Sequence, residues 1–403
     1  MSDTDTPAEP SDPGALRPTL AELARLFLKI GVIGFGGPAA HIALMEDEVV
    51  VRRRWISRSH FLDLIGATNI IPGPNSTEMT MHVGFERAGW RGLITAGVSF
   101  ILPAVIISAG LAWAYVRFGS LPEIEPFLIG IRPAVVAIVL GAVWRLGRTA
   151  VTSVRLALLG VGASVAVLTG LGEIPALLIF GLIGTAWLAL ADRDPGNGAN
   201  ESLFPVLPIG AKWSFGASLA GFVGAAATPI TLPKLFLFVL KIGAVLYGSG
   251  YVLVAYLEGG LVNDYGWLSK DQLLDAIAIG QFTPGPVLST ATFIGYQLYG
   301  LPGAIVATAG IFLPSFLFVL ILNPLIPKLR QSRWTAAFLD SVNVVSLALM
   351  AAVTIDLAAT MHQVDDWIIL AVSSLLTFWY KANAAWIVLG CAALGWFLGL
   401  VPP

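Results

Sequence analysis

The stretch Gly66-Ala-Thr-Asn-Ile-Ile-Pro-Gly-Pro-Asn-Ser-Thr-Glu78 places a Pro-Gly-Pro triplet inside an apolar segment, and residues 278–290 repeat it as Ala-Ile-Gly-Gln-Phe-Thr-Pro-Gly-Pro-Val-Leu-Ser-Thr. Proline removes a backbone donor and clashes with the preceding helical turn, while glycine permits unusual backbone angles. A helix that reaches either triplet is therefore expected to break. The residues that follow, Asn75-Ser76-Thr77 in one copy and Ser289 in the other, favour the start of a new helix.

The composition is that of an integral membrane protein. Of the 403 residues, 56% are hydrophobic and only 12% are charged, and the mean hydropathy is +0.81. A soluble domain carries about 25% charged residues, so this chain has too much apolar surface for a soluble core. Residues 1–19 are acidic and rich in Pro, Ser and Thr, and they lack the pattern of a cleavable signal peptide. They are expected to form a disordered tail.

At membrane depth an interrupted helix survives only where it is buried in protein or lines a polar cavity. A helix that begins there presents unpaired N–H groups and partial positive charge. Two such breaks at corresponding places in two half-chains indicate the binding site of a transporter, for an anion. The predicted substrate-binding residues are Lys29, Gly36, Gly37, Asn69, Pro72, Gly73, Pro74, Asn75, Ser76, Thr77, Lys241, Gln281, Pro284, Gly285, Pro286 and Ser289.

An internal repeat supports this interpretation. Trp55 and Trp267 are 212 positions apart (267 − 55 = 212), and the same offset relates Lys29 to Lys241 and Asp63 to Asp275. The offset is 212 as far as Pro72 and Pro284, and it becomes 211 from Gly84 and Gly295 onward. A constant offset with a single one-residue slip indicates a duplication. The expected domains are an N-terminal repeat over 20–191, a linker over 192–231 and a C-terminal repeat over 232–403. Residues 215–229 within the linker are apolar enough for a central helix, and whether they cross the membrane is left open.

The distribution of basic residues indicates that the two halves run in opposite directions. Positive charge marks the cytoplasmic side of a membrane protein. The first break is flanked by Arg52, Arg53, Arg54, Arg58, Arg87 and Arg91, whereas the matching loops of half two have no such excess. One span later the bias reverses and half two carries Lys328, Arg330 and Arg333. The predicted fold is an all-α integral membrane protein with two inverted-topology repeats of about five to six membrane helices each, and with broken or re-entrant helices at Pro-Gly-Pro.

Several charged residues admit two interpretations. Lys29 and Lys241 supply positive charge to the cavity, or extend to the membrane interface, or form a structural ion pair. Arg145 and Asp356 occupy matched positions with opposite charge, which suits a pair across the pseudo-twofold or two separate interface positions. Glu46 and Glu258 are matched acids for which salt bridges with neighbouring bases are expected.

Half one alone carries Glu78 and His82, four residues apart on one helix face. A carboxylate and an imidazole at membrane depth are candidates for proton coupling, or else form a partly exposed polar face. Asn69 and Gln281, just before the breaks, either donate to an oxyanion or cap the broken backbone.

Other function classes find little support. The single cysteine and the four scattered histidines offer no metal site, and there is no Walker A loop and no dinucleotide fingerprint. No cofactor is therefore expected. The basic run Arg52–Arg54 is explained by anionic lipid and topology rather than by nucleic acid. An intramembrane enzyme would have to rely on Glu78 and His82 with Ser76, and the chain is not expected to be an enzyme.

The pattern Phe35-Gly-Gly-Pro38, then Glu46, Trp55 and Asp63, then Pro72-Gly-Pro74, with a second copy in half two, resembles the chromate ion transporter family. The family's motif positions correspond to Gly36, Gly37, Pro38 and both triplets, and the chain departs from the pattern at Gly248-Ser249-Gly250.

This resemblance implies a multi-pass carrier of the inner membrane that exports chromate, with sulfate as a structural mimic, driven by the membrane gradient. The expected mechanism is alternating access between the two halves. Another oxyanion such as sulfate, or an anion channel, is the alternative. Whether the chain forms a homodimer is left open.

Overall fold

The computed structural model describes residues 18–35, 37–119, 121, 124–191, 229–248, 250–323, 332–380 and 382–399, and every regular element within them is a helix. Three of the expectations fall on residues outside these ranges. They are residues 1–17 of the tail, residues 192–228 of the linker with its central helix, and Gly36 of the predicted site.

The order of helices in the first half of the chain recurs in the second. Half one contains α1 (Leu20–Ile33), α2 (Pro38–Met45), the π-helix η1 (Glu46–Arg52), α3 (Arg58–Thr68), α4 (Asn75–Phe118), α5 (Glu125–Ala150), α6 (Val154–Leu168) and α7 (Glu173–Ala191). Half two contains α8 (Leu232–Val245), the 3₁₀ turn η2 (Gly250–Val252), α9 (Leu253–Leu257), the π-helix η3 (Glu258–Asp264), α10 (Lys270–Phe282), the 3₁₀ turn η4 (Val287–Ser289), α11 (Thr290–Leu322), α13 (Arg333–Ala358), α14 (Val364–Phe378) and α15 (Ala384–Gly399). Pro72-Gly73-Pro74 lies between α3 and α4, and Pro284-Gly285-Pro286 lies between α10 and η4.

Helices α3 and α10 begin in the same way. Ser57 Oγ accepts a hydrogen bond from the backbone N–H of His60 at 3.3 Å, and Ser269 Oγ accepts one from the N–H of Gln272 at 3.1 Å. An N-cap hydroxyl satisfies one of the free N–H groups of the first turn. The repeated Trp-x-Ser sequence therefore fixes where each of these helices starts.

The long helices α4 and α11 each fold back on themselves at a glycine. Ala88 and Gly89 leave the helical conformation within α4, with φ of +60° at Gly89, and Tyr299 and Gly300 do the same within α11. Close contact between the two arms requires a second glycine. A Cβ atom on Gly84 would lie 2.4 Å from the Gly92 carbonyl oxygen. These glycines allow two tight helical hairpins.

The first arm of α4 also returns alongside α3. The Arg87 guanidinium donates to the Trp55 carbonyl at 2.9 Å, and the His60 imidazole lies 3.6 Å from the Glu86 carboxylate. The outer ends of α3 and of this arm therefore meet, and the first Pro-Gly-Pro triplet lies at the opposite, inner end of the pair.

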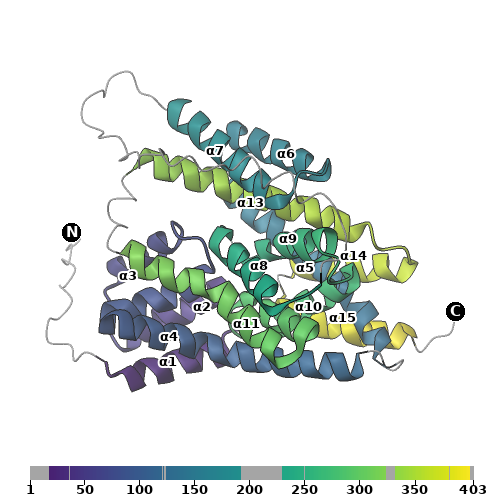
Figure 1. Ribbon diagram of the computed structural model, residues 1–403, viewed down its shortest axis with the longest axis horizontal. Helices are drawn as coiled ribbons and strands as arrows, with labels where there is room; N and C mark the ends of the chain where they lie inside the picture. Colours follow the sequence, from purple (N-terminus) through teal and green to yellow (C-terminus); the bar gives the residue numbers. More distant parts are fainter. Residues whose placement is uncertain are drawn as a thin grey trace, which may run out of the picture.

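The helices form two bundles, and each bundle takes helices from both halves of the chain (Figure 1). The core bundle contains α1–α4 and α8–α11, in which α1 packs on α4, α8 packs on α11, and α4 packs on α11. The flanking bundle contains α5–α7 and α13–α15. In it, α5 packs against α14 and α15, while α13 packs against α6 and α7. The sequence repeats are thus interleaved in space.

Within the described residues, five helical segments are long and apolar enough to cross a membrane. They are Asn75–Phe118, Glu125–Ala150, Glu173–Ala191, Val287–Leu322 and Arg333–Ala358. Large apolar side chains also face outward from the shorter helices, such as Val161 on α6, which is 62% exposed. An apolar exterior is stable in lipid rather than in water.

Candidate functional site: a cavity between two Pro-Gly-Pro triplets

Each Pro-Gly-Pro triplet is tied to the opposite half of the chain by a backbone hydrogen bond. The Gly73 N–H donates to the Leu246 carbonyl at 2.7 Å, and the Gly285 N–H donates to the Gly34 carbonyl at 2.9 Å. The two acceptors occupy matched positions just after α8 and α1. Gly73 and Gly285 have φ of +148° and +94°, which only glycine adopts readily. The same cross-connection is therefore made twice, once from each half.

Both breaks border one central cavity, which has a volume of about 570 Å³. Asn75 and Val287, the first residues of the elements that follow the two triplets, line it together, and so do Gln281 and Gly285. Its size is within the roughly 300–1,000 Å³ typical of ligand pockets. Of the predicted site residues, Gly37, Asn75, Gln281 and Gly285 meet in this cavity.

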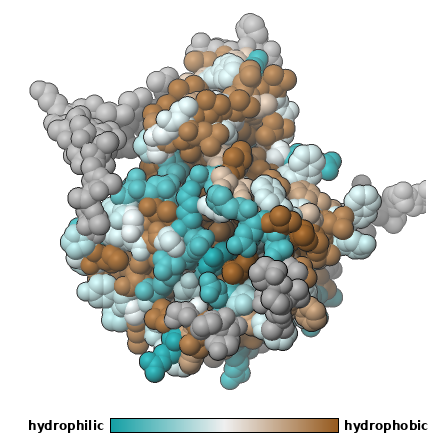
Figure 2. All heavy atoms as spheres, turned by 90° about the vertical axis from the view of Figure 1, so that its right-hand side faces the viewer, coloured by the Kyte–Doolittle hydropathy of each residue, from teal (hydrophilic) through white to brown (hydrophobic). Residues whose placement is uncertain are grey.

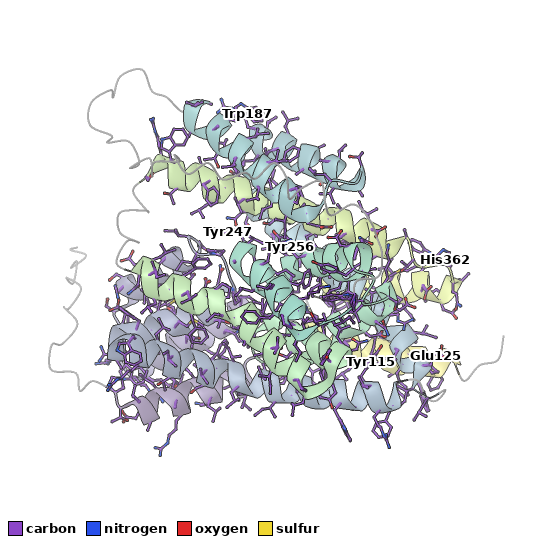
Figure 3. The ribbon with its side chains drawn as sticks, viewed as in Figure 1. Tyr115, Glu125, Trp187, Tyr247, Tyr256 and His362 are labelled. Carbon is purple, nitrogen blue, oxygen red and sulfur yellow. The ribbon has the colours of Figure 1, made fainter. Side chains whose placement is uncertain are left out.

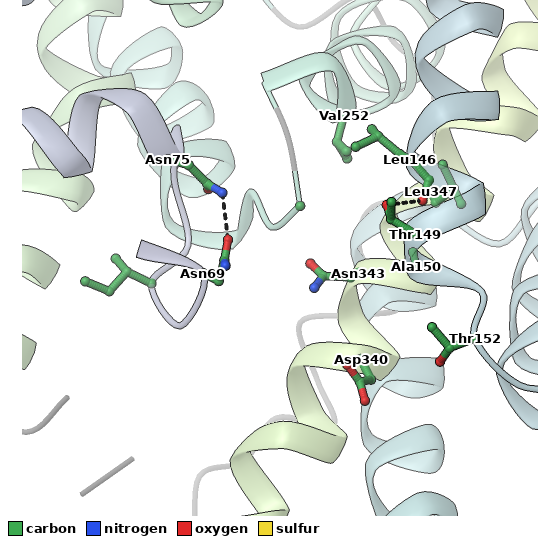
Figure 4. Close-up of a pocket in the computed structure, with 12 residues that line it drawn as sticks. Asn69, Asn75, Leu146, Thr149, Ala150, Thr152, Val252, Asp340, Asn343 and Leu347 are labelled. Atoms are coloured by element: carbon green, nitrogen blue, oxygen red, sulfur yellow. Dashed lines mark hydrogen bonds between the residues drawn. The ribbon is translucent and has the colours of Figure 1, made fainter. Parts of the chain in front are cut away.

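Two further cavities extend the central one toward the surface. A side cavity of about 190 Å³ shares Asn75, Leu146 and Gly248 with it, and lies between the start of α4 on one side and α5 and α13 on the other (Figure 4). The predicted site residue Asn69 lines this side cavity and accepts a hydrogen bond from the Asn75 amide at 2.9 Å.

An outer cavity of about 480 Å³ shares Thr152 and Asp340 with the side cavity. The exposed side chains of Arg155 and Arg333 line it, at the starts of α6 and α13. We call this end of the molecule the basic end. The three cavities are linked by shared lining residues, from Arg155 and Arg333 at the basic end to Asn75 and Gly285 at the breaks.

At the opposite end a buried ion pair joins the core bundle to the flanking bundle. Arg132 of α5 donates through Nε to Asp275 Oδ1 at 3.0 Å and through Nη2 to Asp275 Oδ2 at 3.2 Å, and its Nη1 lies 3.1 Å from Asp271. Tyr115 Oη donates to Asp275 Oδ2 at 2.8 Å, and the Asp275 carboxylate is fully buried. We call this the latched end. It carries Tyr115, Glu125 and His362 in Figure 3, and Figure 2 shows hydrophilic residues gathered near its centre.

Contacts between the two bundles are also more extensive at the latched end than at the basic end. At the latched end α10 packs on α5 and α15 of the flanking bundle. Its counterpart α3 packs on α4 and η1 and makes no comparable contact with α13 or α7. The core bundle is therefore docked on the flanking bundle through elements of half two, namely η2, α9 and α10.

Glu78 and His82 lie inside the core bundle rather than in the central cavity. Both side chains are fully buried. A Cβ atom on Gly73 would lie 2.1 Å from Glu78 Oε1 and 2.4 Å from Ser315 Oγ, so the carboxyl group rests directly on the first triplet. His82 Nδ1 lies 3.0 Å from the Asn323 side-chain oxygen. Glu78 makes no salt bridge with any residue that the structure describes.

Other predicted site residues are buried around the triplets and do not line the central cavity. Pro72, Gly73, Pro74, Pro284 and Pro286 are buried in the core bundle. The hydroxyl groups of Thr77 and Ser289 are buried and have no hydrogen-bond partner among the described residues. Ser76 instead contacts an imidazole, described below.

The two predicted lysines lie away from the cavity. Lys29 Nζ forms a salt bridge with Glu48 at 2.7 Å, and half of its side chain is exposed. Glu48 is also paired with Arg53. Lys241 is exposed on α8 and does not line the central cavity either. The geometry therefore matches the surface-pair interpretation of Lys29 more closely than its substrate-binding role.

The matched acids behave as expected, while the matched pair of Arg145 and Asp356 does not meet. Glu46 pairs with Arg58 at 3.3 Å, and Glu258 lies 3.7 Å from the Lys270 ammonium. Asp356 accepts a hydrogen bond from Lys270. Its counterpart Arg145 lines the central cavity instead.

His41 was not predicted, and it connects the two breaks. Its Nε2 lies 2.9 Å from the Gly34 carbonyl, the same oxygen that accepts the Gly285 N–H, and its Nδ1 lies 3.2 Å from Ser76 Oγ. Because a carbonyl only accepts, Nε2 carries the proton, and Nδ1 of the neutral ring accepts from the Ser76 hydroxyl. The matched residue in half two is Leu253, and this difference between halves was a signal in the sequence.

Three relatives are similar to this chain along most of its length. A chromate transport protein of Cupriavidus metallidurans is 31% identical over 394 residues, covering 97% of this chain and 96% of the relative. A probable chromate transport protein of Synechococcus elongatus is 30% identical over 371 residues, covering 90% of each. A chromate transport protein of Pseudomonas aeruginosa is 29% identical over 404 residues, covering 98% of this chain and 95% of the relative.

No solved structure matches the chain. The sequence model of the chromate transporter family matches residues 21–187 and 233–396, so each half carries one copy of the family's repeat and both triplets lie within the matched regions. Together with its apolar helices, this match identifies the chain as a member of the chromate transporter family, a family of multi-pass membrane proteins.

Proposed function

We propose that the protein exports chromate, or a similar oxygen-bearing dianion, across the cytoplasmic membrane by alternating access. In this proposal the two halves are inverted-topology repeats, the Pro-Gly-Pro triplets interrupt helices within the bilayer, and substrate binds between the triplets. Two relatives are named chromate transport proteins, and the family resemblance covers both halves.

The observation that carries the proposal is the central cavity. Asn75 and Val287 begin the elements after the two triplets and line the same cavity, and reciprocal backbone hydrogen bonds tie the triplets across the halves. N-terminal turns carry partial positive charge and free N–H groups, which favour an anion. A site built at the boundary of two repeats is exposed alternately to either side when the repeats move.

The conformation supports a direction as well. The cavity path leads to the basic end, whereas the Arg132–Asp275 pair closes the opposite end. The positive-inside rule places Arg155 and Arg333 on the cytoplasmic side. The structure then corresponds to an inward-open state, ready to take an anion from the cytoplasm. Export follows when the latched end opens.

Glu78 is the proposed link to the membrane gradient. Its buried carboxyl group contacts Gly73, whose N–H is bonded to Leu246 of the other half. Burial of an ionised carboxylate without a cation is costly, so a change of protonation would disturb the first triplet directly. His82 lies one helical turn further along the same arm of α4.

Transport by the purified protein in liposomes tests the proposal. For protein inserted inside out, we expect saturable uptake of radiolabelled chromate into the vesicles. This uptake should be inhibited by excess sulfate and should depend on a pH gradient. Absence of uptake in a protein that remains folded would contradict it. A second candidate is sulfate itself as the cargo, favoured by the shared tetrahedral shape, and uptake of sulfate that chromate fails to inhibit would support that candidate instead. Conductance without saturation would indicate a channel.

A further inference from the structure

We propose that Arg145 is the anion-binding cation of this transporter, and that it holds one oxygen-bearing dianion in the central cavity together with the Gln281 amide. This inference rests on the proposed function and names the residues that carry it. The sequence assigned the positive charge of the site to Lys29 and Lys241, neither of which lines the cavity.

Arg145 is the one charged side chain among the described residues that line the central cavity. Among the lining residues that the structure describes there is no Asp or Glu, so none of them offers a carboxylate that competes for the guanidinium. The Arg145 side chain is exposed although it lies on α5, where the helix faces the core bundle. The cavity itself is the place in which that charge is accessible.

The neighbourhood of Arg145 supplies neutral donors. The Gln281 Nε2 amide is buried and has no hydrogen-bond partner among the described residues, and it lines the same cavity. A buried donor without a partner is unfavourable, and a bound anion would supply the missing acceptor. The Tyr251 hydroxyl lies near Gly37, since a Cβ atom on that glycine would be 3.9 Å from it.

The chemistry of the lining selects the class of ligand. A guanidinium presents a planar fork of donors that matches two oxygens of a tetrahedral oxyanion. The Gln281 amide and the N-terminal residues Asn75 and Val287 line the same cavity. Such a site favours chromate or sulfate over a monatomic anion, because several donors separated in space are satisfied at once.

The second half cannot form an equivalent site. The residue matched to Arg145 is Asp356, which accepts a hydrogen bond from Lys270 at the far side of the fold. A duplicated protein that kept two cation positions would bind two anions. This chain is therefore expected to bind one anion per molecule, and calorimetry with chromate or sulfate gives the stoichiometry directly.

The decisive test compares Arg145→Gln with Arg148→Gln in the purified full-length protein. Arg148 is exposed on α5, three residues after Arg145, and does not line the central cavity, so it serves as the matched control. Binding of chromate and of sulfate is measured by calorimetry, and thermal stability is measured without ligand. We expect R145Q to bind about 10- to 100-fold more weakly, because a charged hydrogen bond contributes about 1.5–3 kcal/mol, while R148Q changes affinity less than about twofold.

Two further variants separate charge from folding. Arg145→Lys keeps the charge without the planar fork and should lose less affinity than R145Q. Arg145→Cys in a Cys391→Ala background is modified with a thiol reagent that adds either an ammonium or a sulfonate group. Recovery of binding with the ammonium and not with the sulfonate is the expected result, even where the unmodified variant is less stable.

The outcomes distinguish this inference from the function on which it rests. If the unaltered protein binds neither chromate nor sulfate, both proposals are overturned together. If the unaltered protein binds and R145Q binds equally well, Arg145 is not the anion site although the transport function stands. Equal rescue by ammonium and sulfonate would also overturn the inference.

Discussion

The two ends of this molecule are built from matched sequences, but the bundles are in contact at one end and a cavity lies between them at the other. At the latched end Asp275 on α10 is bound by Arg132 on α5, and helices of the two bundles are in contact. At the basic end the matched residues are Asp63 on α3 and Asn343 on α13, and Asn343 lines the side cavity. A single exchange of arginine for asparagine between repeats thus accompanies the difference between a closed end and an accessible one. The two ends of the duplicated chain have therefore diverged at this matched position.

The strongest expected effect is at the glycine of the first triplet. In Gly73→Ala the new Cβ would lie 2.1 Å from Glu78 Oε1 and 2.4 Å from Ser315 Oγ, at a φ of +148°. Overpacking costs about 1–3 kcal/mol, and the backbone strain costs about as much again. We expect chromate transport to fall more than tenfold, together with a clear decrease in Tm.

Alanine substitutions at two other glycines provide the comparison for G73A. In Gly285→Ala, its counterpart, the nearest atoms to the new Cβ are the Ala104 Cβ at 3.0 Å and the Gly31 carbonyl oxygen at 3.4 Å, so this variant should retain more activity than G73A. Gly110→Ala on α4 has open space around the new Cβ and serves as the control. Equal activity in G73A and G110A would show that the first break tolerates a side chain and has no special role.

The next effect concerns the latch itself. Arg132→Gln leaves the fully buried Asp275 carboxylate without its guanidinium partner, a loss that typically costs 3–5 kcal/mol. Asp275→Asn leaves Arg132, which is 26% exposed and still lies near Asp271, so its cost should be smaller. We expect a larger decrease in Tm for R132Q than for D275N in thermal unfolding of the purified protein. The reverse order would mean that the pair does not hold the latched end.

A gain-of-contact variant tests the matched position at the other end. Asn343→Arg places a guanidinium where Arg132 stands in half one and should attract Asp63, which favours closure of the basic end. An exposed ion pair contributes at most about 1 kcal/mol, which shifts the balance between the two states about fivefold. Transport by N343R should therefore slow by about that factor, with Asn343→Gln close to the unaltered protein. Equal transport by the two variants would mean that an arginine at position 343 does not favour closure of the basic end.

The smallest effect is expected for Lys29→Gln. Lys29 is half exposed, and its partner Glu48 keeps a second salt bridge with Arg53. Loss of one such pair costs about 1 kcal/mol or less, so chromate affinity should change less than about twofold. A loss of affinity as large as that of R145Q, at unchanged Tm, would restore Lys29 to the binding site.

Much of this arrangement follows from local sequence. The Pro-Gly-Pro triplets, the Trp-x-Ser helix starts and the matched acids predict where helices end, where they begin and which salt bridges form, because each depends on neighbours in the chain. The offset of 212 predicts that the second half repeats the first. The central cavity was also anticipated in part, since Asn75, Gln281 and Gly285 were expected to face one ligand.

Long-range packing decided the rest. Lys29 and Arg145 both lie on apolar helices, and only the packing of α5 against the core bundle places Arg145, not Lys29, at the cavity. In the sequence His41 is an isolated histidine. Its partners Gly34 and Ser76 are 7 and 35 positions away, and only the folded chain brings them to the imidazole. Each bundle contains helices from both halves of the chain, and no periodic pattern in the sequence predicts this arrangement. Differences between matched positions, such as His41 against Leu253, were the available signal.

Access to Asn75 from each side of the membrane tests the central claim most directly. Asn75→Cys is prepared in a Cys391→Ala background, since Cys391 is the single native cysteine, and is treated with a membrane-impermeant maleimide in inside-out and right-side-out vesicles. The account predicts rapid modification from the cytoplasmic side, slow modification from the other side, and protection by chromate. Equal rates from both sides, or faster modification from the periplasmic side, would contradict a cavity that opens at the basic end and is shut at the latched end.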